Sequence, residues 1–225
     1  MNGSTPAAGG LPSEREALVL VSAAHASRDE AALRGALLEA AATAGQEPVE
    51  EVLLQAYLFL GFPAAIWAFG IWRSLAPGRR RAEHDDHDRL SPEANENAND
   101  LASTWERAGE AVCARVYSTN YEKLRRNVQA LHPELERWMI LEGYGKVLSR
   151  PTIDLPTREL CIVASLAVTG WEPQLHSHLR GALNAGAEPV EAEEALEAGL
   201  RYAPTEEWRG RARTLWQQVL RRHVR

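Results

Sequence analysis

A carboxylate and an imidazole stand where two successive helices could bring them together. Glu159 and His178 are nineteen residues apart, and Gly170-Trp171-Glu172-Pro173 between them is typical of a helix end and restart. A short connection makes the two helices antiparallel neighbours, so both side chains can face one crevice. A carboxylate beside an imidazole holds its tautomer and keeps a proton available near neutral pH, as general acid–base catalysis requires. A buried histidine satisfied by a glutamate explains the same two residues without catalysis.

Arg150 is a candidate for binding an anion. A guanidinium fork matches a carboxylate with two parallel hydrogen bonds, and the neighbours Ser149 and Pro151 favour a position outside a regular helix. The alternative interpretation is a surface arginine at a helix end. We expect Arg150 to hold the carboxylate of a small acid.

The other histidines and the cysteines give weaker signals. His176 is two residues from His178, so a helix turns it onto a different face. The run Glu83–Asp88 has the residue types of a metal site, but a charged run among helix-breaking residues is usually solvated. Cys113 and Cys161 have neither CxxC nor zinc-ligand spacing, which argues against a disulfide scaffold or a structural zinc site. We expect no bound metal and no disulfide.

The composition is that of an ordinary globular protein. The 225 residues are 45% hydrophobic and 25% charged, which suffices for the core of one large or two small domains. A net charge of −6 gives no broad attraction to nucleic acid or to anionic membranes, so neither is expected as a partner. Residues 1–12 lack the pattern of a signal peptide. Together with the cysteine usage, these features favour a cytoplasmic location.

The hydrophobic periodicity predicts an all-α fold. Apolar residues recur at spacings of three and four, and strand-like alternation is nearly absent. The segment Val52–Trp72 is apolar and long enough to suggest a membrane span. Gly61-Phe62-Pro63 interrupts this segment in the middle, so we interpret it as two short buried helices.

The chain contains an internal repeat. The motif LRGAL at Leu33–Leu37 recurs at Leu179–Leu183, and the motif EPVE at Glu47–Glu50 recurs at Glu188–Glu191. Upstream, Glu14-Arg15-Glu16 aligns with Thr157-Arg158-Glu159. Three matches in the same order predict a duplicated helical unit.

The repeat and the composition divide the chain into four parts. Residues 77–100 are charged and rich in helix breakers, with only Leu90 able to anchor a core, which predicts a linker. The predicted division is a flexible tail at 1–12, a degenerate unit at 13–76, the charged linker at 77–100, and a unit at 101–225 with the better-preserved site.

Three segments of the second copy carry a resemblance to a known family. They are the helix start Leu155–Leu160, the helix His178–Gly186, and Glu142–Pro151, which is similar to a Trp-Gly-x-x-Trp-Ser-Arg-Pro motif. These segments, and Gly61-Phe62-Pro63 in the first copy, resemble the carboxymuconolactone decarboxylase family. The resemblance covers 13–75 and 102–201. It implies two all-α units with the alkylhydroperoxidase D-like fold.

The resemblance also implies a set of site residues. Alkylhydroperoxidase D, in the wider superfamily, uses a Cys-x-x-Cys-x-x-x-His run and an upstream glutamate to reduce peroxides. Setting that histidine on His178 places the glutamate at Glu159 and the cysteines at Trp171 and Gln174. Because both sulfurs are missing, we set the peroxidase reaction aside. The implied catalytic residues are His178 and Glu159, and the expected substrate-binding residues are Arg150, Tyr144, Trp171 and Gln174.

The implied activity is a lyase that removes carbon dioxide from a small carboxylated lactone or a related keto acid without a cofactor. His178 would stabilise the developing oxyanion, and Glu159 or His178 would return a proton to carbon. Two departures weigh against catalysis: Ala32 aligns with His178 in the first copy, and the second copy lacks the Gly-x-Pro turn. The competing hypothesis is a non-catalytic small-acid binder or oligomeric scaffold.

The resemblance further implies self-association. Single-unit members of the family form rings, commonly hexamers, so a chain with two units is expected to form a homo-oligomer of three chains. Trp67, Phe69, Ile71 and Trp72 are more apolar than a small surface helix warrants. We expect them to be buried against the other unit or a neighbouring chain.

Overall fold

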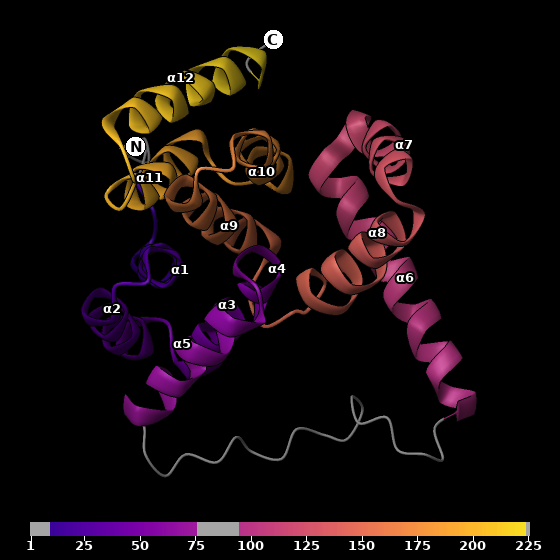
Figure 1. Ribbon diagram of the computed structural model, residues 1–225, viewed down its shortest axis with the longest axis horizontal. Helices are drawn as coiled ribbons and strands as arrows, with labels where there is room; N and C mark the ends of the chain where they lie inside the picture. The colour runs from indigo at the N-terminus through magenta and orange to yellow at the C-terminus, as the bar shows by residue number, and fades with distance from the viewer. Residues whose placement is uncertain (1–9, 76–94, 224–225) are drawn as a thin grey trace, which may run out of the picture.

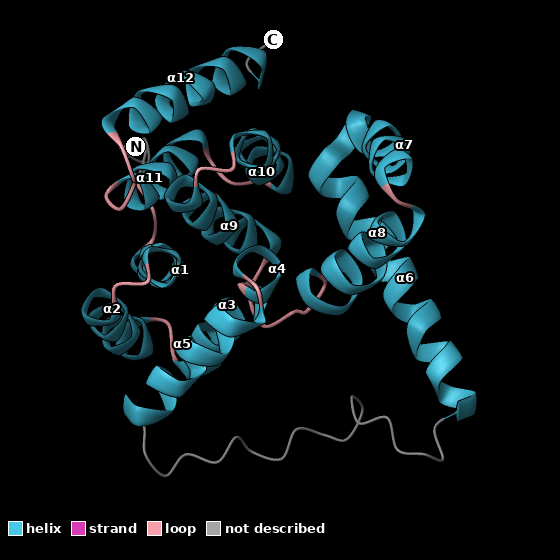
Figure 2. Ribbon diagram, viewed as in Figure 1, coloured by secondary structure: helices cyan, strands magenta, loops and turns pink. Residues whose placement is uncertain are grey.

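The computed structural model of the chain describes residues 10–75 and 95–223. All regular structure in these two ranges is helical, as the hydrophobic periodicity predicts (Figures 1 and 2). Over the same residues, none of the helices combines the length and the apolar character needed to cross a membrane. The predicted tail up to residue 9 and the run Glu83–Asp88 lie outside the described residues.

The described part of the first half, residues 10–75, forms five helices. Asp29 caps the second by accepting a hydrogen bond from the Ala32 amide at 3.0 Å. Gly61, with a φ of 81°, stands between the fourth and the fifth, so Val52–Trp72 is interrupted where we predicted, although its first part is itself divided. The helices are α1 (Ser13–Ser27), α2 (Glu30–Thr43), α3 (Gln46–Gln55), α4 (Tyr57–Leu60) and α5 (Phe62–Leu75).

The second half begins with a long helix at Asn95, so regular structure starts inside the stretch 77–100 that we expected to be linker throughout. Asp154 caps α9 through the Thr157 amide at 2.8 Å, and Pro189 occupies the first turn of α11. The elements are α6 (Asn95–Tyr117), the 3₁₀ turn η3 (Ser118–Asn120), α7 (Tyr121–Leu131), α8 (Pro133–Trp138), the π-helix η4 (Met139–Leu148), α9 (Leu155–Thr169), α10 (Glu172–Ala185), α11 (Pro189–Leu200) and α12 (Glu206–His223).

Helix α6 and the π-helix η4 cross at two glycines. A Cβ atom on Gly109 would lie 2.1 Å from the carbonyl oxygen of Ile140, and one on Gly145 would lie 2.1 Å from that of Trp105. Only glycine allows the two backbones to approach this closely. The crossing brings Tyr144 of η4 against Tyr117 at the end of α6, with ring centroids 6.2 Å apart.

Helices α1 and α9 pack against each other at the centre of the left-hand part of Figure 1. The hydroxyls of Ser22 and Ser165 lie 2.8 Å apart across this contact. These two serines are separated by 143 residues, which is the separation that aligns Glu16 with Glu159 in the predicted repeat. Equivalent positions of the two copies therefore meet at one hydrogen bond.

Reciprocal ion pairs join the two halves. Arg15 of α1 donates to Glu191 of α11 at 2.6 Å, and Arg158 of α9 donates to Glu51 of α3 at 2.9 Å. In each case the first helix of one predicted copy binds the third helix of the other. This symmetry supports the duplication, which stays a prediction.

Two of the large apolar residues of α5 are buried within their own half, whereas Phe62 and Ile66 are exposed. Ile71 and Trp72 are each 5% exposed, and α5 packs on α2 and α3. The Trp72 indole donates to Glu50 of α3 at 3.1 Å. The expected burial against the other half or a neighbouring chain is therefore wrong for these two residues. Trp67 and Phe69 are half-buried.

Candidate functional site

Glu159 and His178 meet between α9 and α10. Gly170, with a φ of 79°, ends α9 in the left-handed conformation, and α10 begins two residues later and packs back on it. His178 Nδ1 lies 2.8 Å from Glu159 Oε2, which is a hydrogen bond in which the ring nitrogen is the donor. The short connection makes α9 and α10 neighbours, as we expected, and this arrangement brings Glu159 and His178 together.

The pair is almost completely enclosed. Glu159 has no exposed surface and His178 is 5% exposed. Phe59 of α4 packs edge-on against the imidazole, with centroids 5.4 Å apart and planes at 87°. Glu159 Oε1 is buried and has no hydrogen-bond partner among the described residues. The open crevice that we expected at the pair is therefore a nearly sealed site, because α4 of the first half closes over it.

Gly181 permits the close packing around the carboxylate. A Cβ atom on this residue would lie 2.6 Å from Glu159 Oε2 and 2.7 Å from Val116 Cγ1. Gly35, at the equivalent position of the first LRGAL motif, has nothing within 4 Å of such an atom. The two glycines are thus a matched pair in which only the second is constrained by packing.

Gly181→Ala is expected to lower the free energy of unfolding by about 1–3 kcal/mol, because the added methyl group overpacks the site. Gly35→Ala is expected to raise it by about 0.5–1 kcal/mol, since alanine favours a helix interior. Urea denaturation of the two variants measures both changes. Equal effects of the two substitutions would contradict the packing around Glu159.

Cys113 lies near the pair, which the sequence gave no reason to expect. It is fully buried on α6, and burial first, then the charge of Glu159, raises the pKa of its thiol to about 12. The thiol is therefore protonated at neutral pH and is not the reactive thiolate that peroxide reduction needs. Cys161 is also fully buried, and burial likewise raises its pKa to about 12.

Two tyrosines continue the site beyond Glu159. Burial raises the pKa of Tyr117 to about 12 and that of Tyr144 well above its usual value, and the charge of Glu159 contributes to both. Both phenols are therefore neutral hydrogen-bond donors at neutral pH. Tyr144, an expected substrate-binding residue, is 5% exposed and lies in the core. The spacing of Cys113, Val116 and Tyr117 places all three on one face of α6. This sequence pattern could have indicated that α6 lines the site.

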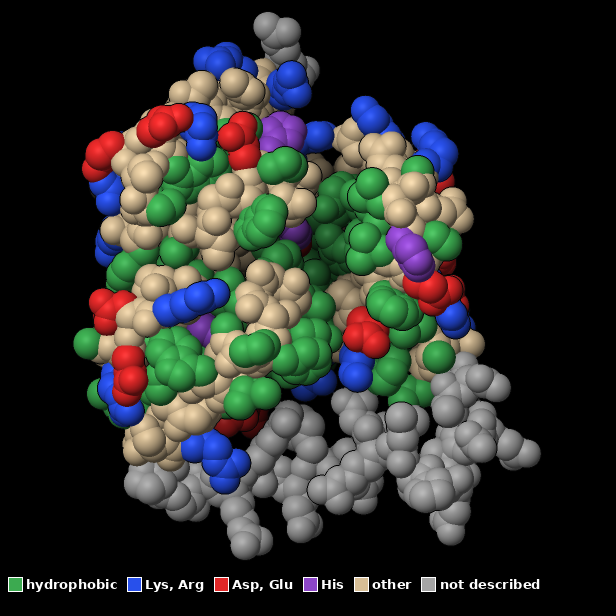
Figure 3. Space-filling model, viewed as in Figure 1, with side chains coloured by type: hydrophobic (Ala, Val, Ile, Leu, Met, Phe, Trp, Pro, Cys, Tyr) green, Lys and Arg blue, Asp and Glu red, His purple; other side chains and the backbone are tan. Residues whose placement is uncertain are grey.

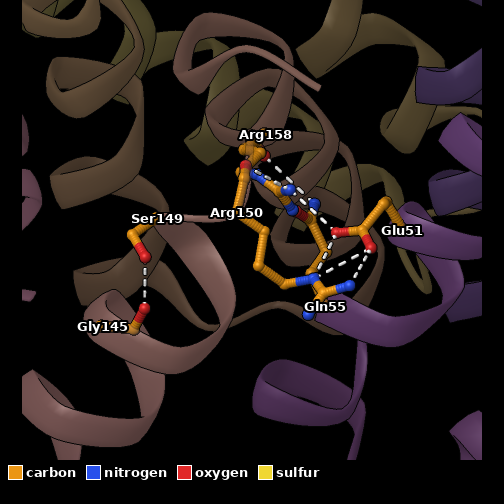
Figure 4. Close-up of polar contacts among 6 residues, drawn as sticks. All are labelled: Glu51, Gln55, Gly145, Ser149, Arg150 and Arg158. Carbon is orange, nitrogen blue, oxygen red and sulfur yellow. Dashed lines mark hydrogen bonds and ion pairs between the residues drawn. The ribbon is translucent and has the colours of Figure 1, made fainter. Parts of the chain in front are cut away.

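Arg150 belongs to a separate buried network (Figure 4). Its Nε lies 2.9 and 3.0 Å from the two carboxylate oxygens of Glu51. Arg158, which is fully buried, donates to the same carboxylate and to the Arg150 carbonyl, and hydrogen-bonds Gln55. The carboxylate that Arg150 holds is thus Glu51 from the first half. Burial alone would raise the pKa of Glu51, but hydrogen bonds from the two arginines outweigh it and lower that pKa.

The two remaining expected residues are on the surface. Trp171 is 60% exposed beside the first turn of α10, and Gln174 is exposed one turn before His178. The positions that the resemblance assigned to cysteines therefore lie on the solvent side of the imidazole.

A pocket of about 160 Å³ lies beside the pair, between α10 and the segment from α6 to α7. Figure 3 shows this face of the molecule hollowed between the part that contains α9–α12 and the part that contains α6–α8. Ser177, the residue before His178, and Tyr117 line the pocket. Further lining residues are Asn120, Lys123, Asn127 and Arg180. Across the described ranges, no group of three His, Cys, Asp or Glu side chains is placed to hold a metal ion.

Comparison with known proteins agrees with the resemblance of the second copy. The sequence model of the carboxymuconolactone decarboxylase family matches residues 133–218, which run from the start of α8 into α12. The matched segment contains Glu159, His178 and Arg180. No curated protein matches the chain.

Proposed function

We propose, because the sequence model of the carboxymuconolactone decarboxylase family matches residues 133–218, that the chain is a carboxy-lyase. The proposed substrate is a small carboxylated lactone or a related keto acid. The observation that carries the proposal is the 2.8 Å hydrogen bond between Glu159 and His178 inside the matched domain.

The proposed reaction uses this pair as an acid–base unit. The bond between the substrate carbon and its carboxylate breaks, carbon dioxide leaves, and the electron pair moves onto the lactone carbonyl oxygen. Glu159 holds Nδ1 of His178, so a protonated ring presents Nε2–H to that oxygen or to carbon. Transfer of the proton to carbon completes the reaction, and a proton from solvent then reprotonates the imidazole of His178. The pair, the phenols of Tyr117 and Tyr144, and the enclosing Phe59 exclude water from the step.

A second candidate function is a small-acid binder or oligomeric scaffold without turnover. The near-complete burial of Glu159 and His178 favours it, because a substrate reaches the imidazole only if Phe59 or a neighbouring side chain moves. The ion pair of Arg150 with Glu51 favours it as well, since that guanidinium already holds a carboxylate.

Incubation of the protein with unsaturated five-membered lactones that carry one or two carboxylates tests the proposal. We expect saturable release of carbon dioxide, and the same lactones as amides are expected to be inert. A β-keto acid serves as the second substrate class. Ligand-induced stabilisation in the thermal melt without carbon dioxide release would contradict the lyase and support the binder.

A further inference from the structure

The pocket beside the pair contains two cations without an acidic partner. Lys123 of α7 and Arg180 of α10 both line it, and neither forms a hydrogen bond or ion pair with any part of the chain that the structure describes. Nearby arginines behave differently: Arg125 of α7 binds Glu110 and Glu136, and Arg213 of α12 binds Glu197. Two cations that line one cavity and have no acidic partner are suited to binding an anion there.

The rest of the lining is uncharged and largely polar, with Val116 and Leu124 as its aliphatic members. Asn120, Asn127 and Ser177 line the pocket, and its lining residues include no aspartate or glutamate. Asn184 of α10, at the same wall, is fixed by a 2.8 Å hydrogen bond from its amide to the Val116 carbonyl. The lining thus offers amide and hydroxyl groups that orient a ligand, and it contains no carboxylate that would repel an anion.

Two arginines affect the imidazole of His176 on α10. Burial first, and then the charges of Arg180 and Arg222, lower the pKa of His176 on the neighbouring face of the helix. Acidic residues near Arg180 would have the opposite effect on this imidazole. The two arginine contributions, which are smaller than that of burial, are consistent with an anion-attracting surface beside the pocket.

Tyr117 connects the pocket to the catalytic candidates. Its side chain lines the pocket, and its ring packs edge-on against Tyr144 at a centroid distance of 6.2 Å. Burial is the main cause of the raised pKa of Tyr117, and the charge of Glu159 and hydrogen bonding to Ser177 are smaller contributions, so this residue is near both the pair and the pocket. A ligand in the pocket therefore lies beside Tyr117 and Ser177, the residue before His178.

We propose that this pocket binds a short-chain dicarboxylate, with Lys123 and Arg180 each holding one end. The volume of about 160 Å³ is below the roughly 300 Å³ at which pockets for drug-sized ligands begin, which selects a small acid. The role of this pocket as the anchor of the reacting acid rests on the proposed function. Its role as a dicarboxylate-binding site does not depend on any reaction.

Titration calorimetry with succinate and maleate tests the site, with neutral succinamide as the matched probe at constant ionic strength. We expect both acids to bind the full-length protein and succinamide not to bind. Arg180→Gln and Lys123→Gln are each expected to weaken succinate binding about tenfold or more, since each removes a charged hydrogen-bond donor. Arg126→Gln, which removes an exposed charge from α7 outside the pocket, is the control and is expected to leave binding unchanged.

The outcomes separate this site from the proposed reaction. Binding of both acids that is lost in the two pocket variants and kept in His178→Gln supports the pocket even if no substrate is decarboxylated. Absence of binding, or equal binding by wild type and both pocket variants, would overturn the dicarboxylate site. Carbon dioxide release that is insensitive to Arg180→Gln and Lys123→Gln would overturn the anchoring role and leave the lyase intact.

Discussion

Replacement of His178 by glutamine is expected to lower the rate of decarboxylation by about 100- to 10,000-fold, the range typical of losing a general acid–base group. Glutamine keeps an amide that can donate to Glu159, but it neither gives nor takes a proton near neutral pH. The loss is expected in kcat and in kcat/KM together, because the proton is transferred only in the chemical step. Steady-state release of carbon dioxide measures both parameters.

Stability is the necessary control for this variant. His178 is the hydrogen-bond partner of Glu159 Oε2, and Glu159 Oε1 has no partner among the described residues. A poor substitute donor would leave a buried carboxylate unsatisfied at a cost of about 1–3 kcal/mol. His223→Gln, at the exposed end of α12, is the matched histidine variant and is expected to change neither activity nor melting. A folded His178→Gln protein with wild-type turnover would exclude the imidazole from the reaction.

Replacement of Arg158 by methionine is expected to lower the free energy of unfolding by about 3–5 kcal/mol, the usual cost of removing one partner from a buried ion pair. Arg158 is fully buried and hydrogen-bonds Glu51, Gln55 and the Arg150 carbonyl. Its loss leaves Glu51 with one of its two arginines and leaves Gln55 without a guanidinium donor to its amide oxygen. Urea denaturation of the purified variant measures the change.

Arg213→Met is the matched control for an exposed ion pair. Arg213 binds Glu197 through two hydrogen bonds of 2.7 Å, but its side chain is 55% exposed. Removal of this pair is expected to cost less than about 1 kcal/mol, because water solvates both charges. If the two arginine variants lose the same stability, the network of Figure 4 has no special role in joining the halves.

The same network gives the stability a defined dependence on pH. The folded-state pKa of Glu51 is lower than its ordinary value of 4.5, so ionised Glu51 favours the folded state. This contribution is complete above pH 4.5 and is lost as the pH falls below it through the folded-state pKa. In Glu51→Gln, the free energy of unfolding is therefore expected to fall less steeply between neutral and acidic pH than in the wild type.

The helical fold and the approach of Glu159 to His178 could be predicted because both depend on short-range patterns. Apolar spacing sets the helix faces, and the connection at Gly170 makes α9 and α10 neighbours. The enclosure of the pair could not be predicted in this way. Phe59 reaches His178 from the other half of the chain, and the sequence between them does not specify that contact.

The partner of Arg150 and the lining of the pocket could not be predicted either, because both depend on contacts between distant segments of the chain. The side chain of Arg150 was suited to a carboxylate, but its partner Glu51 is 99 residues away and becomes adjacent only when the halves pack. The pocket brings Lys123 of α7 together with Arg180 of α10. Arg180 belongs to the repeated LRGAL motif, but Lys123 belongs to no motif and is 57 residues away, so their approach becomes visible only in three dimensions.

The reciprocal contacts between the halves restrict how this sequence can diverge. Arg15 uses the carboxylate of Glu191, and Arg158 uses that of Glu51. A substitution at any of these four positions removes a counterion from a charge in the opposite half, although Glu51 keeps Arg150 and Arg15 keeps Asp154. A matching substitution there restores the balance. We therefore expect homologous sequences to show covariation within each pair. One half of the chain can then be exchanged for that of a distant homologue only together with the other half.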